Sequence, residues 1–592
     1  MTTENVTIDD VSGNVEEEAH GGMLVADVLQ RHQIPFLFTL CGGHISPILV
    51  AAKSRNIRVV DVRHEATAVF AADAVARLSG VPGVAVVTAG PGLTNTITAV
   101  KNAQMAQSPV VVLGGAAATM LKGRGALQDI DQMALMTPHV KWSAAASRVA
   151  DIVPLLEQAF AEAQEGVPGP VFVELPVDLL YPETLVREMY GANAGGKGLR
   201  GRALSWYLRR HASKLFEDAW QRGAGAPLPY EVPMTTASDL QKAASYLRQA
   251  SRPVLLVGSQ ATLRAPWIDD LRRGVQRLGI PTFLSGMARG LLGNHALHVR
   301  HGRSKALKEA DLIILAGVPC DFRLNYGRHL SRSASIVSVN RSREELQQNC
   351  KSDLPIQADA GAFLADLAAV WEGDDRQWLD WFSTLKQQDA ERDAEILHKA
   401  QEQTAYVNPL YLCQELERLI GENSVIIGDG GDFVATASYI LRPRGPLSWL
   451  DPGVFGTLGA GAGFALGARL CRPEAEVWLL YGDGSAAYSL AEFDTFARHG
   501  LSLLAVIGND ASWAQIAREQ EPILGDAVGT ELAYADYHLV AQGYGGKGLR
   551  VDDPEEVPET LERAARLAKE GHPVLVNALL GKTDFRKGSI SM

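Results

Sequence analysis

Two aspartates in the last third of the chain stand where carboxylates could hold a metal ion. Asp483 lies between two glycines directly after the apolar run Val477–Tyr481, and Asp510 closes the next apolar run 27 residues further on. In a parallel sheet both would lie at the carboxyl ends of neighbouring strands, where α/β proteins bind ligands. Magnesium takes oxygen ligands, typically one or two carboxylates together with phosphates. The spacing therefore predicts a magnesium site beside a diphosphate, which the glycines allow to approach the backbone.

A further carboxylate, Glu65, precedes a predicted helix over Ala66–Leu78. On residue type alone, a glutamate here is a favourable charge at a helix N-terminus. A glycine-rich segment, Thr88–Asn95, follows the next predicted strand, and two more, Gly428–Asp432 and Phe455–Gly459, lie in the last third of the chain. Each of these glycine-rich segments alone predicts only a turn, but the order in which they occur along the chain is more specific evidence of function.

Together these segments resemble the thiamine-diphosphate enzymes of the acetolactate synthase type, and the resemblance extends over essentially the whole chain. In that family the aspartate of Gly-Asp-Gly and the second residue of a closing Asn-Asn pair bind magnesium. The resemblance implies Asp483 and Asp510 as metal ligands, with the carbonyl of Ser512 completing the protein ligands. Aspartate here replaces the usual second asparagine, which keeps an oxygen ligand and adds a charge. We therefore expect metal binding of altered strength.

The same resemblance assigns the contacts to the cofactor. It implies that Glu65 is a buried carboxylic acid hydrogen-bonded to the pyrimidine N1′, where it promotes the reactive tautomer, while the cofactor supplies the bond-making chemistry. Leu458 stands where acetolactate synthases usually have methionine, and it is implied to bend the cofactor. The other implied cofactor-binding residues are Gly90, Pro91, Gly92, Asn95, Gly431, Asp432, Gly456, Gly482, Asp483, Gly484, Ser485, Asp510 and Trp513.

Positions that face the substrate in this family argue against the condensation of pyruvate. Acetolactate synthases carry Pro-Lys in the motif that reads Glu174–Asp178 here, and a tryptophan where the spacing gives Glu519. The segments Cys41–Ser46, Arg323–Gly327 and Thr583–Met592 instead resemble relatives that act on CoA thioesters. This resemblance implies a 2-hydroxyacyl-CoA lyase, which cleaves the C1–C2 bond of its substrate to an aldehyde and formyl-CoA, or condenses the two in reverse.

His44 and Gln128 are the residues we expect to orient the substrate hydroxyl and carbonyl, although His44 could instead be a structural, hydrogen-bonded histidine. An acetolactate synthase-type pyruvate carboligase is the alternative function. A silent homologue that only binds the cofactor is disfavoured by the presence of Glu65, Asp483 and Asp510. A dehydrogenase is excluded because no Gly-x-Gly-x-x-Gly opens a helix in a βαβ unit. The middle of the chain could hold the CoA nucleotide, ADP, FAD or no ligand, and the C-terminal tail could be a lid or a loose end.

The elements that must position these residues form three blocks. Short apolar runs, such as Phe36–Leu40 and Val171–Leu175, alternate with helical stretches, as in parallel sheets covered by helices. We expect three doubly wound parallel-sheet α/β domains. The expected bounds are a flexible tail over 1–22, a pyrimidine-binding domain over 23–190, a linker with a basic amphipathic helix over 191–232, a central nucleotide-type domain over 233–372, a charged helical linker over 373–403, and a diphosphate- and magnesium-binding domain over 404–592.

Composition limits the class of protein. A net charge of −12 argues against nucleic-acid binding, and no apolar run reaches the roughly 18 residues of a membrane span. Five scattered cysteines without a Cys-x-x-Cys motif exclude a disulfide framework and favour the cytoplasm. The basic helix of the first linker could bind a membrane surface, but packing on the enzyme's own flank is the favoured interpretation. In the family the active site lies between two subunits, so we expect a homodimer or homotetramer.

Overall fold

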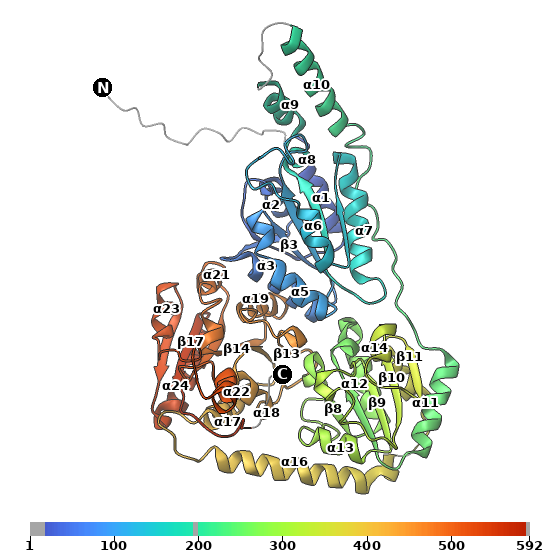
Figure 1. Ribbon diagram of the computed structural model, residues 1–592, viewed down its shortest axis with the longest axis vertical. Helices are drawn as coiled ribbons and strands as arrows, with labels where there is room; N and C mark the ends of the chain where they lie inside the picture. The colour runs from blue at the N-terminus through green and yellow to red at the C-terminus, as the bar shows by residue number, and fades with distance from the viewer. Residues whose placement is uncertain (1–17, 193–198, 374, 588–592) are drawn as a thin grey trace.

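The computed structural model describes residues 18–192, 199–373 and 375–587. These residues form three parallel sheets with helices packed against them, which Figure 1 shows as three lobes, and the predicted α/β fold of three parallel-sheet domains is confirmed. The expected N-terminal tail lies largely outside the described residues. Helix α1 begins at Gly21, two residues before the expected start of the pyrimidine-binding domain. A Cβ on Gly21 would lie 1.9 Å from the carbonyl oxygen of Leu179, so this residue packs closely on the domain.

The N-terminal sheet has the strand order β2-β1-β3-β4-β6-β5. Its three central strands, over 83–87, 110–116 and 171–176, are buried along their whole length, which is why they read as continuous apolar runs rather than as alternating ones. The strands are β1 (Phe36–Leu40), β2 (Arg58–Asp61), β3 (Gly83–Val87), β4 (Val110–Ala116), β5 (Trp142–Ala145) and β6 (Val171–Pro176). The helices are α1 (Gly21–Arg31), α2 (Ser46–Ser54), α3 (Glu65–Ser79), α4 (Pro91–Thr94), α5 (Ile97–Met105), α6 (Gln132–Met136), α7 (Ile152–Gln164) and α8 (Val177–Leu180).

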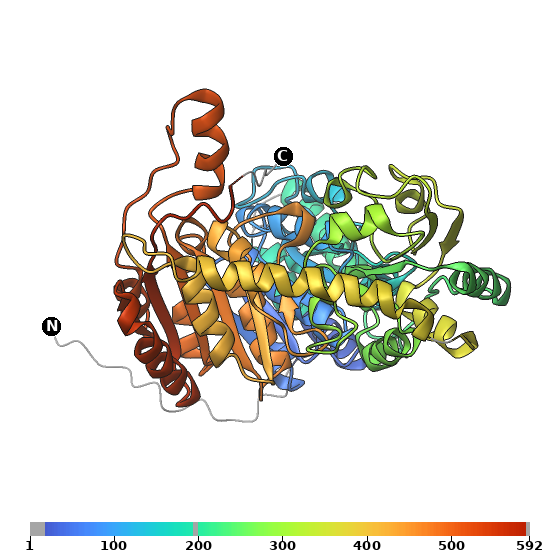
Figure 2. The same cartoon turned by 90° about the horizontal axis from the view of Figure 1, so that it is seen from below.

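The central sheet has the order β11-β10-β9-β7-β8. Its strands are β7 (Pro253–Val257), β8 (Thr282–Leu284), β9 (Leu312–Ala316), β10 (Ser335–Asn340) and β11 (Leu354–Gln357). Its helices are α11 (Ala237–Gln249), α12 (Ile268–Leu278), α13 (Arg303–Glu309), α14 (Arg343–Gln347) and α15 (Ala360–Val370). The long helix α16 (Leu379–Lys399) then crosses to the C-terminal domain, as Figure 2 shows in yellow.

The C-terminal sheet has the order β13-β12-β14-β15-β17-β16. Strands β14 and β15 are parallel neighbours, as predicted, with Gly482 opposite Gly508, so Asp483 and Asp510 follow adjacent strand ends. The strands are β12 (Ser424–Asp429), β13 (Trp449–Leu450), β14 (Glu476–Gly482), β15 (Leu503–Asn509), β16 (Lys547–Val551) and β17 (Pro573–Leu579). The helices are α17 (Pro409–Leu419), α18 (Asp432–Ile440), α19 (Gly461–Cys471), α20 (Asp483–Ala486), α21 (Glu492–Arg498), α22 (Ala514–Leu524), α23 (Tyr537–Gly543) and α24 (Val557–Lys569).

Helices α3 and α19 join the N-terminal and C-terminal domains through one shared apolar core. Glycines on α19 allow this close approach: a Cβ on Gly463 would lie 2.5 Å from Cβ of Phe70, and one on Gly467 would lie 2.5 Å from the carbonyl oxygen of Ala71. The rings of Phe70 and Phe464 meet edge to face at 5.8 Å. The helix that begins at Glu65 is therefore fixed along its length by the C-terminal domain of the same chain.

A helical hairpin of α9 (Glu183–Ala192) and α10 (Leu199–Leu215) stands out from the N-terminal domain at the top of Figure 1. The inner face of α10 packs on the domain, with Leu208 and Leu215 buried. Its outer face leaves Trp206 61% exposed. The favoured interpretation of this basic helix, packing on the enzyme's own flank, thus holds for one of its two faces.

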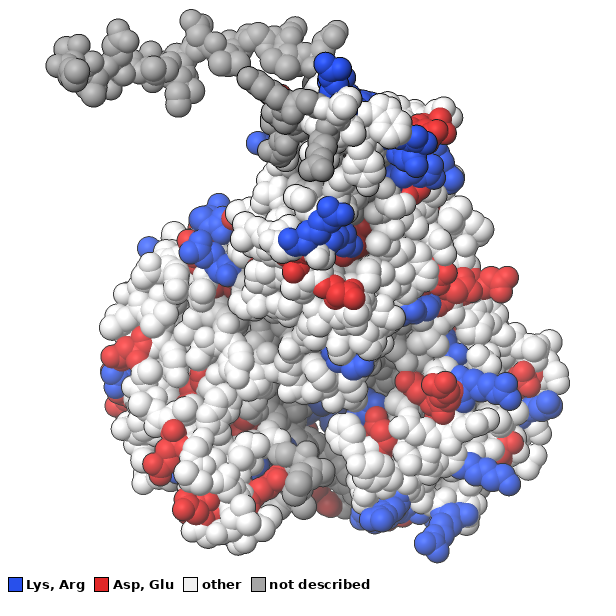
Figure 3. Space-filling view, turned by 45° about the horizontal axis from the view of Figure 1, so that its top comes forward, with Lys and Arg blue, Asp and Glu red and all other residues white. Residues whose placement is uncertain are grey.

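The surface carries charges of both signs. On the face shown in Figure 3, lysine and arginine side chains are interspersed with aspartate and glutamate, and the molecule is hollowed between its lobes. Over the described ranges, no helix has the combination of length and apolar character that a membrane span requires.

Candidate active site

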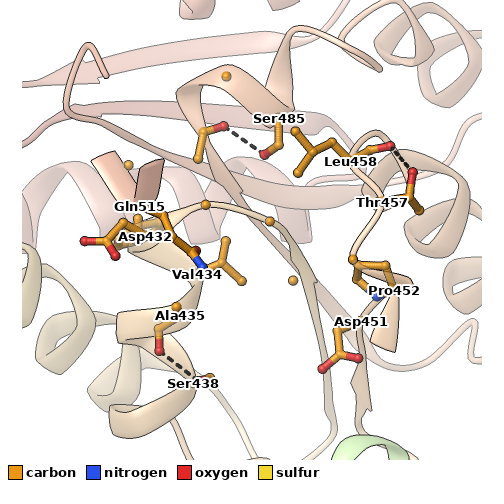
Figure 4. Close-up of a pocket in the computed structure, with 18 of the residues that line it drawn as sticks. Asp432, Val434, Ala435, Ser438, Asp451, Pro452, Thr457, Leu458, Ser485 and Gln515 are labelled. Carbon is orange, nitrogen blue, oxygen red and sulfur yellow. Dashed lines mark hydrogen bonds between the residues drawn. The ribbon is translucent and has the colours of Figure 1, made fainter. Parts of the chain in front are cut away.

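A cavity of about 540 Å³ opens at the carboxyl ends of β12, β14 and β15. It brings together every predicted cofactor and metal residue of the C-terminal domain. Figure 4 shows part of its lining, and the predicted residues among the lining are Gly431, Asp432, Gly456, Leu458, Gly482, Asp483, Gly484, Ser485, Asp510, Ser512 and Trp513.

Glycines bring backbone to the surface of this cavity. Gly430 and Gly431 have φ angles of 59° and 95°, in the left-handed region that glycine adopts without strain. A Cβ on Gly430 would lie 2.2 Å from Cδ2 of Leu458, whose side chain points toward Ser485 in Figure 4. A Cβ on Gly484 would lie 2.5 Å from the ring of Trp513. A larger residue at Gly430 or Gly484 would therefore displace the apolar side chain that lines the cavity.

Asp429, which the sequence reasoning did not assign to the site, fixes the turn that presents Leu458. Its buried carboxylate accepts hydrogen bonds from the backbone nitrogens of Gly459 at 3.0 Å and Gly461 at 2.8 Å. Burial raises the pKa of Asp429 to about 7. A signal was available in the sequence, because an aspartate ending a fully apolar strand must find hydrogen-bond partners inside the protein.

Two carboxylates, Asp483 and Asp510, lie at the edge of the cavity, and the negative charge of Asp483 makes ionisation of Asp510 less favourable. Asp483 is 2% exposed and accepts hydrogen bonds from the backbone nitrogens of Gly484 at 2.8 Å and Ser512 at 3.2 Å. Burial raises the pKa of Asp483 to about 6. Burial, followed by the negative charges of Asp483 and Asp432, raises the pKa of Asp510 to about 7. A divalent cation between them would remove this repulsion, so these residues fit the predicted magnesium ion.

The remaining ligands of such a cation would come from other oxygens. No cluster of three or more His, Cys, Asp and Glu side chains suited to a metal occurs in the part of the chain that the structure describes. Magnesium commonly completes its shell with carbonyl, water and phosphate oxygens. Helix α18 begins at Asp432 beside the cavity, and the free N–H groups of a helix start favour an anion such as a diphosphate.

The side chain of Asp432 is engaged elsewhere. Its carboxylate forms an ion pair with Arg518 of α22 and lies 3.7 Å from Arg586 of the C-terminal segment. The ring of Phe585 meets Tyr439 edge to face at 6.1 Å. The predicted role of Asp432 in binding the diphosphate thus falls to its backbone N–H. The described part of the C-terminal tail contacts α18, and residues 588–592, where the predicted lid would end, lie outside the described residues.

The N-terminal domain holds a second group of predicted residues around Glu65. Glu65 is 6% exposed and accepts a hydrogen bond from Nδ2 of Asn95 at 3.0 Å. The Gly90–Asn95 segment passes beside it, and a Cβ on Gly92 would lie 3.7 Å from Oε1 of Glu65. Pro91 begins α4 directly after Gly90, whose φ of 61° forms the turn.

His44 and Gln128 lie around the same turn. Nδ1 of His44 is 3.1 Å from Oγ1 of Thr88, and burial lowers the pKa of this histidine. A Cβ on Gly90 would lie 2.6 Å from the carbonyl oxygen of Gln128. Gln132, which the sequence reasoning missed, accepts a hydrogen bond from the backbone nitrogen of Gly90 at 3.0 Å and donates to Glu174 at 3.0 Å.

The two groups do not share a cavity within one chain. No residue of the N-terminal domain lines the C-terminal cavity in the described parts of the chain. Near Glu65 the C-terminal domain contacts the backbone of the N-terminal domain: both carboxylate oxygens of Glu492 on α21 accept a hydrogen bond from the backbone nitrogen of Arg63 at 3.1 Å. The structure therefore presents two half-sites on one chain, each incomplete for the predicted chemistry.

The central domain contributes side chains that the sequence reasoning did not assign. Arg289, Phe322 and Arg323 line the same cavity as Asp483. A second cavity of about 740 Å³ shares Arg289 and Ser438 with it. The basic residues that line this second cavity come from five separate segments, which is why no sequence pattern revealed them; they are Arg289, His298, Arg300, His301, Arg303, Lys305, Arg392, Arg442 and Arg586.

Packed loops and side chains fill the edge of the central sheet, at which a nucleotide could otherwise bind. A Cβ on Gly258, after β7, would lie 2.4 Å from the carbonyl oxygen of Gly317, after β9. Nε2 of the buried Gln260 lies 2.7 Å from Oδ1 of Asn340 and 2.7 Å from Oε1 of Gln107 of the N-terminal domain. A nucleotide inserted between these loops would have to displace this network.

Three family models cover the chain in the order of its domains. Residues 19–135 match the N-terminal TPP binding domain of thiamine pyrophosphate enzymes, residues 240–367 match the central domain, and residues 429–578 match the C-terminal TPP binding domain. The chain belongs to the thiamine pyrophosphate enzyme family.

Individual relatives divide into two groups. The chain is 54% identical to 2-hydroxyacyl-CoA lyase 2 of Danio rerio, over 97% of this chain and 93% of the fish protein. It is 53% identical to the protein of the same name in Homo sapiens, over 97% and 92% of the two chains. The acetolactate synthase large subunit of Mycobacterium tuberculosis is 34% identical, over 95% of each chain.

Proposed function

We propose that this protein is a thiamine-diphosphate- and Mg²⁺-dependent 2-hydroxyacyl-CoA lyase that cleaves the C1–C2 bond of its substrate to an aldehyde and formyl-CoA. The observation that carries the proposal is identity of 53–54%, over nearly the full length, to proteins with the name 2-hydroxyacyl-CoA lyase 2. Bound thiamine diphosphate would supply a thiazolium ring that accommodates the electron pair released when the carbon–carbon bond breaks.

The residues of this chain would then position the cofactor and handle protons. Asp483, Asp510 and the carbonyl of Ser512 would hold Mg²⁺, which would neutralise the charge of a bound diphosphate. Glu65 holds a proton in a hydrogen bond to the pyrimidine N1′, and its burial and the bond from Asn95 fix that carboxyl group. His44 and Gln128 hydrogen-bond the substrate hydroxyl and carbonyl.

The active site is proposed to form between two chains of a homodimer or homotetramer. Support comes from the separation of the half-sites, since the described lining of the cavity that contains Asp483 includes neither Glu65 nor any other residue of the N-terminal domain. In an antiparallel pair of subunits, each N-terminal half-site would face the C-terminal cavity of its neighbour, and two equivalent sites would result.

The basic second cavity is proposed to bind the phosphates of the CoA thioester. Arg300 and Arg442 are already paired with Asp393. Arg303 donates to the carbonyl oxygen of Arg323 at 3.0 Å, and no carboxylate pairs with Arg303 or Lys305 over the described ranges. These two cations are therefore free to meet an anion, beside the cavity that holds the cofactor.

We expect Arg303→Gln to raise the KM for a 2-hydroxyacyl-CoA by roughly tenfold, the effect of about 1.4 kcal/mol of lost binding, with a small change in kcat. Arg332→Gln, an exposed arginine of the same domain, is the matched control and should leave KM unchanged. Steady-state kinetics measures both. Equal KM values for the two variants would show that the CoA phosphates do not bind in this cavity.

The decisive assay supplies thiamine diphosphate, Mg²⁺ and either a 2-hydroxyacyl-CoA or pyruvate, and measures aldehyde, formyl-CoA and acetolactate. A lyase releases aldehyde and formyl-CoA in equal amounts. We expect Glu65→Gln to lower kcat by roughly 100-fold or more, the usual worth of a positioned acid or base. Full activity of Glu65→Gln would disprove the proposed mechanism.

Acetolactate synthase is the second candidate function, because relatives of that name are 34% identical over 95% of the chain. The same assay separates the two activities. Consumption of pyruvate with formation of acetolactate, in the absence of any CoA thioester, would favour the synthase.

A further inference from the structure

Cys320 and Cys350 lie together in the central domain although 30 residues separate them in the sequence. Cys320 follows β9 and is 3% exposed, and Cys350 lies between α14 and β11. Their thiols share a hydrogen bond. Both flank Gly327: a Cβ there would lie 3.5 Å from Sγ of Cys320 and 3.8 Å from Cβ of Cys350. Two thiols that interact directly need only a small movement of their side chains to form a sulfur–sulfur bond.

The two cysteines differ in their access to solvent. Cys350 lines a surface cavity of about 640 Å³ together with Arg343, Asn349 and Lys351. Hydrogen bonds from Cys320 and Ser352 lower the pKa of Cys350, and the pKa of Cys320 is raised by that same bond and by burial. Because the thiolate is the reactive form, Cys350 is the attacking thiol and Cys320 the one that follows.

The loop that carries Cys320 also reaches the cofactor cavity. Phe322 and Arg323, two and three residues further on, line that cavity. Asp321 pairs with Arg323 at 2.6 Å, and Nδ2 of Asn349 donates to the carbonyl oxygen of Cys320 at 2.9 Å. One short loop thus links the thiol pair to the side chains of the site.

We propose that Cys320 and Cys350 are a redox modification site, at which hydrogen peroxide converts the two thiols into a disulfide that constrains the loop carrying Phe322 and Arg323. The thiolate of Cys350 attacks one peroxide oxygen, the O–O bond breaks, and hydroxide leaves and is protonated to water. The sulfur of Cys320 then attacks the sulfenic sulfur, the S–O bond breaks, and a second water leaves. Two electrons pass from the thiols to the peroxide.

The test treats the native, reduced holoenzyme with an equimolar amount of hydrogen peroxide and maps its peptides without reduction. The expected result is loss of two hydrogens from the intact mass and a linked Cys320–Cys350 peptide that dithiothreitol separates. The exposed Cys41 is the internal comparison. Oxidation of Cys41 ahead of the pair, or a pair that stays reduced, would overturn the proposal.

Two variants make the assignment specific. Cys320→Ser should stop at a sulfenic acid on Cys350, which dimedone traps, whereas Cys350→Ser should leave Cys320 unmodified. The kcat/KM of the wild type should change on oxidation and return with dithiothreitol, and that of Cys350→Ser should not respond. A mapped disulfide with unchanged kcat/KM would disprove the connection to the cavity, and since the mapping needs no turnover, its outcome is independent of the proposed lyase activity.

Discussion

At the scale of single residues, the pair Asp483 and Asp510 sets the electrostatics of the cofactor cavity. Asp483 is buried and Asp510 is partly buried, and the pKa of Asp510 is raised to about 7 by this burial and by the charge of Asp483. A metal ion binds carboxylates in their ionised form, so protons compete with the metal. Because this chain has aspartate at position 510, where the family usually has asparagine, we expect it to attract a cation more strongly and its metal binding to depend on pH.

We expect Asp510→Asn to weaken Mg²⁺-dependent binding of thiamine diphosphate by roughly tenfold, because a lost charge near a cation costs about 1 to 4 kcal/mol. Below the pKa of about 7, the wild type loses affinity as Asp510 takes up a proton. Its affinity should therefore begin to fall below about pH 8, whereas that of the variant, which keeps only Asp483 with a pKa of about 6, should begin to fall about one pH unit lower. Titration of Mg²⁺ with cofactor fluorescence as the signal measures both. A variant with the pH dependence of the wild type would disprove this role.

Residue types at strand ends made half of this site predictable. The glycines and carboxylates of the C-terminal cavity follow strands in sequence order, so Asp483, Asp510 and Leu458 were accessible to motif reasoning. Gln132 and Glu492 were not, because each acts by accepting a hydrogen bond from backbone far away in the sequence. The contact of Cys320 with Cys350 depends on the packing of loops and leaves no motif.

At the scale of elements, the packing of α3 against α19 determines where Glu65 stands. Interfaces this close depend on glycine, since any side chain at Gly463 or Gly467 meets α3 at 2.5 Å. Overpacking of such a contact forces the backbone to shift and typically costs about 1 to 3 kcal/mol.

We expect Gly463→Ala to lower the melting temperature and to reduce activity, because its Cβ would lie 2.5 Å from Cβ of Phe70 and 2.9 Å from the carbonyl oxygen of Thr67. Gly543→Ala, at the end of α23 with nothing within 4 Å, is the matched control. It should be neutral or stabilising by up to about 1 kcal/mol, since alanine favours helix. Calorimetry measures both, and equal melting temperatures would contradict the expected clash.

The elements were predictable where the sequence pattern is long and periodic. The run Phe36–Leu40 is β1 as predicted, and the helix expected over Ala66–Leu78 is α3 over Glu65–Ser79. Short elements such as β13, with two residues, carry too few side chains to form a pattern. The protrusion of the α9–α10 hairpin was also not predicted, because amphipathic spacing shows that one face packs and not how far the helix stands out from the domain.

At the scale of the whole molecule, the separation of the half-sites leads us to expect that activity depends on the proposed dimer. A chain that lacks Glu65 could still lend its C-terminal cavity to a neighbour. A chain that lacks Asp483 could still lend its Glu65.

Co-expression of Glu65→Gln and Asp483→Asn chains should therefore restore about a quarter of the wild-type activity per dimer site, since half of the dimers are mixed and each mixed dimer has one intact site. Each variant alone should be inactive. Differential affinity tags isolate the mixed dimers, which should have about half of the wild-type activity because one of their two sites is intact. Mixed dimers without activity would show that each site is built within one chain.

The rigid connection between α3 and α19 has a consequence for cofactor loading. Helix α3 begins at Glu65, and α19 follows directly on the turn that presents Leu458, so one packed unit carries parts of two different sites in the proposed dimer. If thiamine diphosphate shifts the turn that carries Leu458 in one site, the α3–α19 contact would transmit the shift to Glu65 in the other site. By thermodynamic linkage, we expect the two cofactors of such a dimer to bind with coupled affinities.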